Sequence, residues 1–513
     1  MSDKATGSYY TPLKLVEYMT EFIKNRFNIN EVLEPAAGDG RFIDTLSSLD
    51  CTIHAIEIDN DKSEHLKNKN YDNLKITCSD FVDYAMEHQE TYSLIIGNPP
   101  YISKKNLSEE KWNTSFDLLD YFNLPHSLFQ NLWVSFILGS IKLLSPNGAI
   151  FFILPFEFLQ VQYAEKLRNF LEIKFNTIEI ITFEEKVFEE IEQDVCLVYL
   201  RNENEEKPFI RYTTFKSISQ TQSTFESVIM RNKPLKKWSN CILNDFETET
   251  LKSISLQYPI IKEFGDISPG IVTGANKFFI INQTVANKLK MEESYLKILS
   301  KSADVSDKLI FTNEDFDLLL QDDKRVILLN LNDAKEDTFT DELKDHLVSG
   351  EEEEINKRYK CSIRKRWYDV PIVENGDVSF FKRYNIIPRI IVNDIQVHTT
   401  DIAYNIRFTE NIDKLSFAFC FYNSLTLVLC EYNGRFYGGG VGELVPNEFK
   451  DLHIPYQAVE KEQVCILDTM FREKRNFTDI VDYVDGIVLN LPKDQIKLLQ
   501  DIRNRYLKRR LKQ

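Results

Sequence analysis

The tetrapeptide Asn98-Pro99-Pro100-Tyr101 directly follows the apolar run YSLIIG, which predicts a buried β-strand over 92–97. Proline and asparagine are common turn formers, so the tetrapeptide also suits an ordinary turn. Its position favours a functional interpretation, because ligands of α/β sheets bind at the carboxyl ends of the strands. We therefore treat these four residues as a candidate catalytic segment.

A glycine-bearing loop, EPAAGDG, follows an earlier predicted strand and runs from Glu34 to Gly40. Glycine lets the backbone approach a ligand closely, as in the first βα turn of nucleotide-binding folds. The loop is not G-x-G-x-x-G, and it has few small residues to hold a pyrophosphate. These features favour a ligand without phosphates over a dinucleotide.

Two further acids follow predicted strands in the same order. Glu57 ends the second strand, about twenty residues after the glycine loop, where a carboxylate can accept both ribose hydroxyls. Asp80-Phe81 follows the third strand and offers an acceptor for an adenine amino group and a ring to pack against the base. Each acid alone suits a helix cap or a surface charge equally well. Ribose, adenine and no phosphate together indicate S-adenosylmethionine.

These residues require a sheet whose strand ends meet at one edge. Short β-branched runs alternate with helical patterns between 31 and 200, which predicts a mostly parallel α/β sheet with helices on both faces. Seven strands are expected, over 32–36, 52–58, 74–78, 92–98, 148–154, 177–183 and 194–200. The polar stretch 201–208 suggests the point where the chain leaves the sheet.

The second half of the chain has a different pattern of residues, and this change predicts a second domain. It contains β-rich pieces at 325–332 and 389–394 and a glycine run at 434–443, and it becomes helical from about 457. We predict a catalytic domain over 1–243 and a second domain over 244–513.

Composition limits the class of protein. The 513 residues are 43% hydrophobic and carry a net charge of −17, which argues against non-specific coating of nucleic acid but allows one basic face. Eight scattered cysteines without a C-x-x-C pair give no zinc-site spacing and suggest reduced thiols. The polar N-terminus lacks a signal-peptide core, and the apolar stretch 149–159 is too short for a bilayer. We expect a cytoplasmic protein that needs no metal and no membrane.

The sequence resembles the gamma-class DNA adenine-N6 methyltransferases, the Taq type of restriction–modification systems. Shared segments in the first half are TGSYYTPLKLVEYM (6–19), LEPAAGDGRF (33–42), AIEID (55–59), SDF (79–81), NPPY (98–101) and VFEEIEQDVCLVYL (187–200). In the second half they are GIVTGANKFFI (270–280), IRKRWYDVP (363–371) and GGGVGELVPNEFKDLHIP (438–455). The resemblance implies a Rossmann-like S-adenosylmethionine-dependent methyltransferase sheet followed by a mixed α+β target-recognition domain.

The resemblance also implies roles for individual residues. The residues expected to bind the cofactor are Tyr10, Thr11, Pro12, Glu34, Ala36, Gly38, Gly40, Glu57, Ile58, Asp80, Phe81 and Asn98. The Asn98 side chain and the Pro99 carbonyl would hold both hydrogens of an adenine 6-amino group, so that its nitrogen attacks the sulfonium methyl without a strong base. Tyr101 and Phe188 would stack on the two faces of a flipped-out base. Family members that methylate cytosine often carry serine at the position of Asn98, so asparagine favours adenine.

Contact with DNA must be reconciled with the acidic composition. The window 357–389 holds nine Lys or Arg against three acids, and such clusters mark phosphate contact. The candidate DNA-binding residues are Arg364, Lys365, Arg366, Trp367, Lys382 and Arg383. A solvated charged loop is the alternative interpretation. The basic tail RNRYLKRRLKQ (503–513) suits a final helical turn better than a DNA contact.

The sequence thus predicts a site-specific DNA adenine-N6 methyltransferase acting on double-stranded DNA. The chain begins almost at the cofactor motif and has no evident nuclease cluster, so we expect a solitary enzyme or the modification half of a system with a separately encoded endonuclease. Two alternatives stay open. One is a protein glutamine-N5 or RNA methyltransferase, which shares Asn-Pro-Pro-Tyr-like motifs but not the large second domain. The other is a catalytically silent DNA-binding protein, against which the intact Asn98, Tyr101 and Glu57 argue.

Overall fold

The computed structural model describes residues 10–512 except 25, 189–193, 204–206, 221, 232–233 and 291–294. The chain divides into two compact units, which we call unit 1 and unit 2. Unit 1 comprises Met1–Thr248, Phe436–Gly440 and Arg505–Gln513, and unit 2 comprises Glu249–Arg435 and Val441–Asn504. The first division lies close to the predicted domain boundary after residue 243, but the two later segments that join unit 1 had no signal in the sequence.

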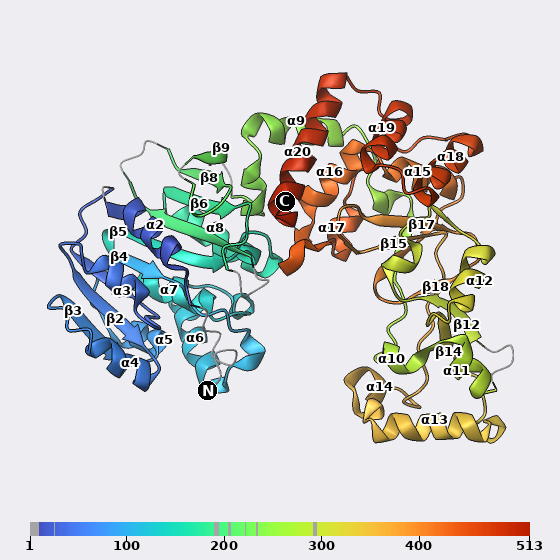
Figure 1. Cartoon of the computed structure of the whole chain (residues 1–513), viewed down its shortest axis with the longest axis horizontal. Coiled ribbons are helices and arrows are strands. Elements are labelled where there is room, and N and C mark those ends of the chain that lie inside the picture. Colours follow the sequence, from blue (N-terminus) through green and yellow to red (C-terminus); the bar gives the residue numbers. More distant parts are fainter. Residues whose placement is uncertain are drawn as a thin grey trace. The chain divides into compact units, whose positions relative to one another are not determined.

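Unit 1 is built on a nine-stranded sheet of order β3-β2-β1-β4-β5-β7-β6-β8-β9 (Figure 1). Its strands are β1 (Glu31–Glu34), β2 (Thr52–Glu57), β3 (Leu74–Cys78), β4 (Tyr92–Gly97), β5 (Leu144–Pro155), β6 (Thr177–Phe183), β7 (Val195–Arg201), β8 (Phe209–Phe215) and β9 (Ser223–Met230). Strands β1 to β5 are parallel, whereas β7 is antiparallel to both neighbours and β9 to β8. The strand order reverses between β1 and β4, and this switch point is where such sheets bind ligands.

The sequence prediction of the fold class and of seven strands is confirmed, and one prediction about the sheet is wrong. The chain does not leave the sheet after β7, because β8 and β9 follow the polar stretch and extend the sheet by two strands. Strand β9 alternates buried and exposed side chains at its C-terminal half, as expected of an edge strand with one solvated face. Because of this mixed pattern, a search for continuous apolar runs does not identify β9 as a strand.

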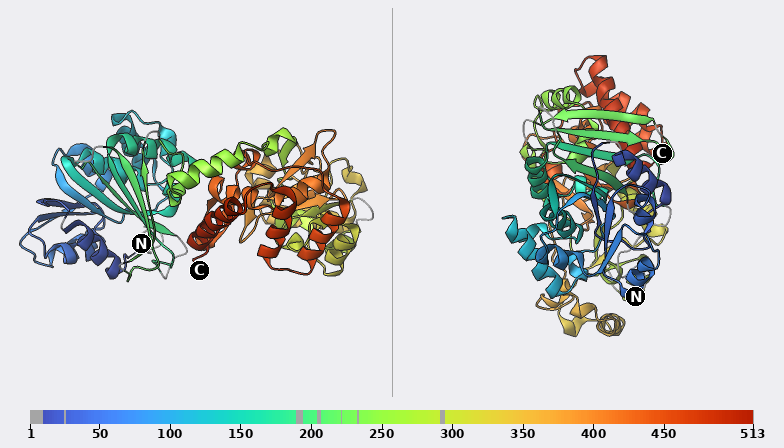
Figure 2. Two further views of the ribbon diagram at one scale, coloured as in Figure 1. Left: turned by 90° about the horizontal axis from the view of Figure 1, so that it is seen from above. Right: turned by 90° about the vertical axis from the view of Figure 1, so that its left-hand side faces the viewer.

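Helices lie on both faces of this sheet (Figures 1 and 2). They are α2 (Leu13–Lys24), α3 (Arg41–Leu46), α4 (Asn60–Lys67), α5 (Phe81–Glu87), α6 (Glu109–Tyr121), α7 (Trp133–Lys142) and α8 (Glu165–Lys174). Buried apolar residues of α2 and α3, such as Met19 and Phe42, share one core with alternate strand residues such as Val32, Leu94 and Phe151. This packing holds the strand ends that form the site.

Unit 2 contains smaller sheets surrounded by helices. One has the order β10 (Gly265–Pro269), β19 (Ala403–Phe408), β15 (Val378–Phe381), β17 (Arg389–Asn393), β13 (Ile310–Phe311), and another the order β11 (Ile280–Ile281), β14 (Ile327–Leu329), β12 (Tyr295–Leu299), β18 (His398–Thr399). Strand β16 (Arg383–Tyr384) pairs with β21 (Gly442–Glu443), and β20 (Arg435–Phe436) lies at the division between the units.

The later helices are α9 (Asp245–Ser255), α10 (Asn276–Phe279), α11 (Gln283–Lys288), α12 (Asn313–Gln321), α13 (Asp341–Glu352), α14 (Tyr359–Ser362), α15 (Lys414–Phe421), α16 (Ser424–Asn433), α17 (Pro446–Lys450), α18 (Lys461–Arg472), α19 (Phe477–Val488) and α20 (Lys493–Leu511). The predicted helical segment from about 457 is confirmed by the last three. In the part of the chain that the structure describes, no single helix is long and apolar enough to cross a membrane, although the bent pair α15 and α16 together has the length and composition.

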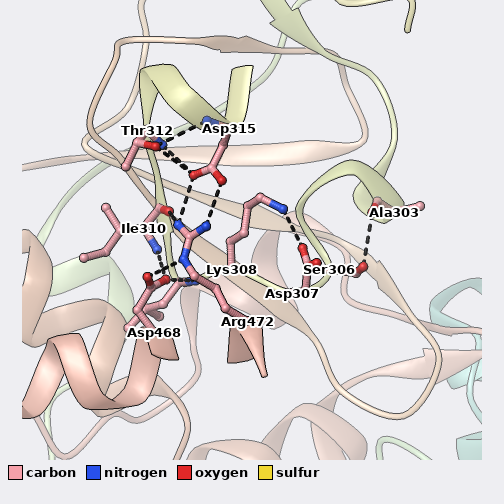
Figure 3. Close-up of polar contacts among 10 residues, drawn as sticks. Ala303, Ser306, Asp307, Lys308, Ile310, Thr312, Asp315, Asp468 and Arg472 are labelled. Atoms are coloured by element: carbon pink, nitrogen blue, oxygen red, sulfur yellow. Dashed lines mark hydrogen bonds and ion pairs between the residues drawn. The ribbon is translucent and has the colours of Figure 1, made fainter. Parts of the chain in front are cut away.

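An ion-pair cluster joins α18 to β13 and α12 within unit 2 (Figure 3). Arg472 donates to the two carboxylate oxygens of Asp315 at 2.8 and 3.0 Å and to Asp468 at 2.7 Å. Asp315 also closes a capping box with Thr312, and Asp468 accepts the backbone N–H of Ile310 at 3.0 Å. Burial alone would raise the pKa of Asp315, but the bonds from Arg472 outweigh it and lower the pKa. The cluster therefore fixes the end of α18 without a group left over for a ligand.

Candidate active site

The carboxyl ends of four neighbouring strands open into one cavity of about 440 Å³ in unit 1. Glu34 ends β1, Glu57 ends β2, Asp80 follows β3 and Asn98 follows β4, and all four line the cavity. The cavity lies across the switch point between β1 and β4, as the sequence predicted for a ligand site.

Glu57 is held at the cavity wall by two backbone groups. One carboxylate oxygen accepts the N–H of Gly38 at 2.7 Å, and the other accepts the N–H of Asp59 at 2.9 Å. Gly38 has a φ of +57°, a conformation that favours glycine, and a Cβ there would meet no atom within 4 Å. Each carboxylate oxygen of Glu57 retains a free lone pair, so the residue can still accept two ligand hydroxyls.

Glu34 is an acid buried beside the cavity, with a residue exposure of 2%. Its Oε2 atom has no hydrogen-bond partner among the described residues. Burial, reinforced by the nearby carboxylates of Asp39 and Glu57, raises the pKa of Glu34 well above its usual range. A cationic ligand group beside Oε2 would offset this penalty.

Asp80 and Phe81 form the third wall at the start of α5. Asp80 caps the helix by accepting the backbone N–H of Val82 at 2.7 Å, and its other oxygen pairs with Lys111 at 2.8 Å. Phe81 is buried, and its ring centroid lies 4.8 Å from that of Phe136. Asp80 is thus a helix cap, and the same cap brings the Phe81 ring to the cavity.

Asn98 is fixed by hydrogen bonds at both ends of its amide. Its nitrogen donates to the hydroxyl oxygen of Thr11 at 3.2 Å, and its oxygen accepts from the hydroxyl of Tyr101 at 2.9 Å. The Tyr101 hydroxyl also lies 3.1 Å from the carbonyl oxygen of Ile153 on β5. Burial raises the pKa of Tyr101 well above its usual range, so the hydroxyl stays protonated and remains a donor. The second lone pair of the Asn98 oxygen is left for a substrate.

The segment before α2 closes the cavity on the side of Asn98. Thr11 is buried, and its carbonyl accepts from Arg41 at 2.6 Å. The Arg41 guanidinium also pairs with Asp39 at 2.8 Å and lies 5.5 Å from the Tyr10 ring centroid. Thr11 therefore connects the Asn98 amide to the Arg41 guanidinium, which also lines the cavity.

Most of the predicted residues line this cavity. They are Tyr10, Thr11, Glu34, Ala36, Gly38, Glu57, Ile58, Asp80, Phe81, Asn98, Pro99, Pro100 and Tyr101. Pro12 and Gly40 do not line it: the Pro12 carbonyl starts α2, and Gly40, with a φ of +82°, begins α3 against Leu66. Sequence reasoning missed Arg41, Lys62 and Lys111, because a basic residue near the start of a helix carries no signal of the direction in which its side chain points.

Phe188 is buried and does not line the cavity. It belongs to the same apolar core against which Tyr101 packs. Residues 189–193, which follow it, lie outside the described part of the chain. Stacking of Phe188 on a base therefore stays a prediction.

Tyr101 also lines a second cavity, of about 590 Å³. Its lining is polar and consists of Tyr101, Ser103, Asn106, Gln130, Asn131, Glu157 and Tyr163. Burial raises the pKa of Glu157, and a hydrogen bond from Tyr163 opposes that shift. Tyr101 and Asn106 line both cavities, so the first cavity has a neighbour rich in hydrogen-bonding groups. Among the described residues, no group of His, Cys, Asp and Glu is arranged to hold a metal ion.

Comparison with known proteins identifies the family. The family described as "Eco57I restriction-modification methylase" matches residues 17–188, and "Type II methyltransferase M.Eco57I, C-terminal domain" matches residues 235–489. Together the two matches cover more than four fifths of the chain. The chain belongs to the type II restriction–modification methyltransferases of the gamma class. As a member of this family it is a DNA methyltransferase.

Individual relatives agree with this assignment. The chain is 27% identical to the type II methyltransferase M.AccI of Acinetobacter calcoaceticus, over 94% of this chain and 93% of the relative. It is 30% identical to M.HindII of Haemophilus influenzae, over 58% of this chain and 60% of the relative. The solved structure of the type IIL restriction–modification enzyme MmeI in complex with DNA has a TM-score of 0.60 at 12% identity, covering 97% of this chain and 76% of that one. At that identity the likeness concerns the fold.

Two of the three predicted DNA-binding arginines of this methyltransferase, Arg364 and Arg366, are bonded within unit 2. Arg364 donates to the carbonyl oxygens of Val272 and Thr273 at 3.1 and 2.8 Å. Arg366 donates to three carbonyls between 331 and 334 at 2.8 Å each, and it pairs with Asp369. Both guanidinium groups therefore hold loops together, and their contact with DNA remains a prediction.

The other four candidates differ in exposure. Trp367 packs on Phe278 and donates to Glu351 at 3.1 Å, so its ring is a structural contact in this conformation. Lys365 and Arg383 are exposed, Lys382 is half-buried, and Arg383 pairs with Glu443 at 3.3 Å. In the same basic window, Arg358 and Lys360 are also exposed. Exposed cations are the ones available to phosphates.

Proposed function

We propose that this methyltransferase acts at specific sites in double-stranded DNA and transfers a methyl group from S-adenosylmethionine to the 6-amino group of an adenine. Family membership supports DNA methylation, and the choice of cofactor and of amino group rests on the residues of the cavity. The partner of such an enzyme would be a separately encoded restriction endonuclease, and methylation would protect the DNA from cleavage by it.

The cavity suits S-adenosylmethionine in three respects. The free lone pairs of Glu57 can accept the ribose hydroxyls, the Phe81 ring can pack against the adenine of the cofactor, and Glu34 Oε2 can accept from the ammonium group. No cluster of backbone N–H groups of the G-x-G-x-x-G type is present in the loop from Glu34 to Gly40, in keeping with a ligand that has no phosphates. When bound, S-adenosylmethionine supplies an electrophilic methyl group on its sulfonium.

The observation that carries the proposal is the double anchoring of Asn98. Thr11 holds its amide nitrogen and Tyr101 its oxygen, so the oxygen is fixed at the cavity rim with one lone pair free. That lone pair can accept one amino hydrogen, and the Pro99 carbonyl can accept the other. Both acceptors draw electron density toward the amino nitrogen and away from conjugation with the ring. A pre-positioned acceptor needs no reorganisation as the nitrogen attacks, and no strong base is required.

The base must leave the duplex to reach Asn98. Flipping is the solution of enzymes that perform chemistry on a base, and stacking on an aromatic ring, at about 1–3 kcal/mol per base, offsets part of its cost. Tyr101 is placed for such stacking by its position after Pro100, and Phe188 is the candidate for the opposite face. The second, polar cavity, which Tyr101 also lines, offers hydrogen-bonding groups for the edge of the base.

The direct test identifies the methylated atom. Purified protein is incubated with S-adenosylmethionine and unmethylated plasmid DNA, and the nucleosides are identified by mass spectrometry. We expect N6-methyladenine, and a loss of methyl transfer of about a hundredfold or more in the Asn98→Ala variant, with S-adenosylmethionine binding falling much less. N4-methylcytosine would refute the choice of adenine. Transfer to RNA or to a glutamine side chain with none to DNA would refute the proposed substrate.

A further inference from the structure

The C-terminal turn of α20 joins two strand ends of the catalytic sheet. Arg509 pairs with one carboxylate oxygen of Asp194 at 2.6 Å, and Lys512 pairs with the other at 2.9 Å. Lys512 also donates to the carbonyl oxygen of Phe183. Phe183 is the last residue of β6, and Asp194 directly precedes β7. The two cations therefore contact both ends of the β6–β7 connection.

This contact is internal to unit 1 and shielded from solvent. The Arg509 and Asp194 side chains are 3% and 12% exposed, and the Arg509 guanidinium lies 4.1 Å from the Phe156 ring centroid. Phe156 in turn donates its backbone N–H to the Asp194 carbonyl at 2.9 Å, which connects the end of β5 to the same point. Burial alone would raise the pKa of Asp194, but the charges of Arg509 and Lys512 outweigh it and lower the pKa. The acid is therefore ionised and paired.

The connection between these two ends carries Phe188, the candidate for the second face of the flipped base. Tyr101, the candidate for the first face, is held to β5 through the carbonyl of Ile153. Resting on the proposed function, we propose that Arg509 and Lys512 are positioning residues for the target base. They fix both ends of the β6–β7 connection against β5 and so set where Phe188 lies relative to Tyr101.

Such a role differs from general stabilisation, and α20 offers a matched control. Arg505 lies one turn before Arg509 on the same helix and pairs with Glu247 at 2.7 Å, and among the described residues its polar contacts are with Glu247 and the Ile242 carbonyl. Arg505→Ala removes one positive charge and one ion pair, as Lys512→Gln does. If this end of α20 served only to stabilise the fold, Lys512→Gln and Arg505→Ala would change the activity to the same extent.

The test compares Lys512→Gln, Lys512→Arg and Arg505→Ala in the full chain. We measure single-turnover methylation, the affinities for S-adenosylmethionine and DNA, and the fluorescence of 2-aminopurine at the target position. We expect Lys512→Gln to slow methylation by about tenfold to a hundredfold and to change the flipping signal, because a small misplacement is costly in catalysis. Both affinities should stay within about twofold, Lys512→Arg should restore the rate, and Arg505→Ala should methylate normally.

Because removal of Arg509 alone leaves the buried Asp194 carboxylate with Lys512 as its remaining ion-pair partner, the second variant replaces both members of the Arg509–Asp194 pair, as Asp194→Asn with Arg509→Gln, and it should behave as Lys512→Gln does. Hydrogen exchange over 183–195, measured without DNA, tests the positioning contact independently of the reaction. Faster exchange is expected in Lys512→Gln but not in Arg505→Ala. Unchanged exchange, or a wild-type methylation rate in Lys512→Gln and in the double variant, would overturn the positioning role. Failure of the wild-type protein to methylate adenine would instead overturn the proposed function.

Discussion

Replacing Tyr101 by phenylalanine separates two tasks that one side chain performs. The hydroxyl donates to the Asn98 oxygen at 2.9 Å, whereas the ring is the candidate stacking surface for the flipped adenine. Tyr101→Phe removes the hydroxyl and keeps the ring, and Tyr101→Ala removes both. The Asn98 amide nitrogen keeps its bond to Thr11 in either variant.

The expected sizes follow from these contacts. A hydrogen bond of this kind contributes about 0.5–1.5 kcal/mol, so release of the Asn98 oxygen in Tyr101→Phe should slow methyl transfer by about twofold to twelvefold. Loss of stacking costs about 1–3 kcal/mol more, so Tyr101→Ala should be slower than Tyr101→Phe by a further five- to 150-fold, approximately. Loss of the hydroxyl should slow the chemical step. Loss of the ring should lower the fraction of DNA in which the target base is flipped out.

Single-turnover methylation with excess enzyme measures the chemical step, and 2-aminopurine fluorescence at the target position measures flipping. Tyr101→Phe should flip the base as the wild type does but methylate it more slowly, and Tyr101→Ala should be impaired in both. Calorimetric titration with S-adenosylmethionine and a thermal unfolding curve exclude loss of cofactor binding or of the fold. If Tyr101→Phe methylates at the wild-type rate, the hydroxyl does not position Asn98. If Tyr101→Ala flips normally, the ring is not the stacking surface.

Three further predictions concern the cofactor and the DNA. Glu57→Ala should weaken S-adenosylmethionine binding by roughly 1.5–3 kcal/mol per lost charge-assisted bond, and an unchanged calorimetric affinity would leave Glu57 with only its bonds to the backbone. Because the raised pKa of Glu34 keeps a proton on the folded protein that the unfolded chain has lost, the free energy of unfolding should fall as pH rises through that range. Denaturant titrations of wild type and Glu34→Gln, at about pH 5 and about pH 7, should give a smaller fall in the variant. Lys365→Ala should flatten the salt dependence of DNA binding by about one unit of slope, whereas Arg366→Ala should chiefly lower the melting temperature; the reverse result would restore Arg366 as the phosphate contact.

The strand ends of the site were predictable because each carries its signal in one short segment. Apolar runs ended at Glu57 and before Asn98, and parallel strands bring such ends to one edge of a sheet. Gly38 was predictable as well, since its positive φ suits glycine. Gly40 was assigned to the cofactor for the same reason, but its task is to begin α3 closely against Leu66. The local sequence indicates that a glycine is needed at a position, but it does not indicate which contact requires that glycine.

Contacts between distant segments had no such signal. The bond that Asn98 donates to Thr11 and the contact of the Tyr101 hydroxyl with the Ile153 carbonyl join residues far apart in the chain, and no spacing rule predicts them. Strand β8 was missed because a polar stretch precedes it, and β9 was missed because its exposed residues break the apolar pattern. A single sequence gives the residue types at each strand end but not the partners that orient them.

The arginines of the chain illustrate why charge counting in a sequence gives only a first estimate of a DNA-binding face. A guanidinium has five N–H donors, which fit backbone carbonyls as readily as phosphates. In unit 2, Arg364 and Arg366 use theirs on carbonyls, and in unit 1 Arg509 is paired with Asp194. Lysine has a single compact and strongly hydrated charge on a flexible stem, so it more often remains at the surface. The surface lysines of the basic window, Lys360 and Lys365, are therefore stronger candidates for phosphate contact than Arg364 and Arg366.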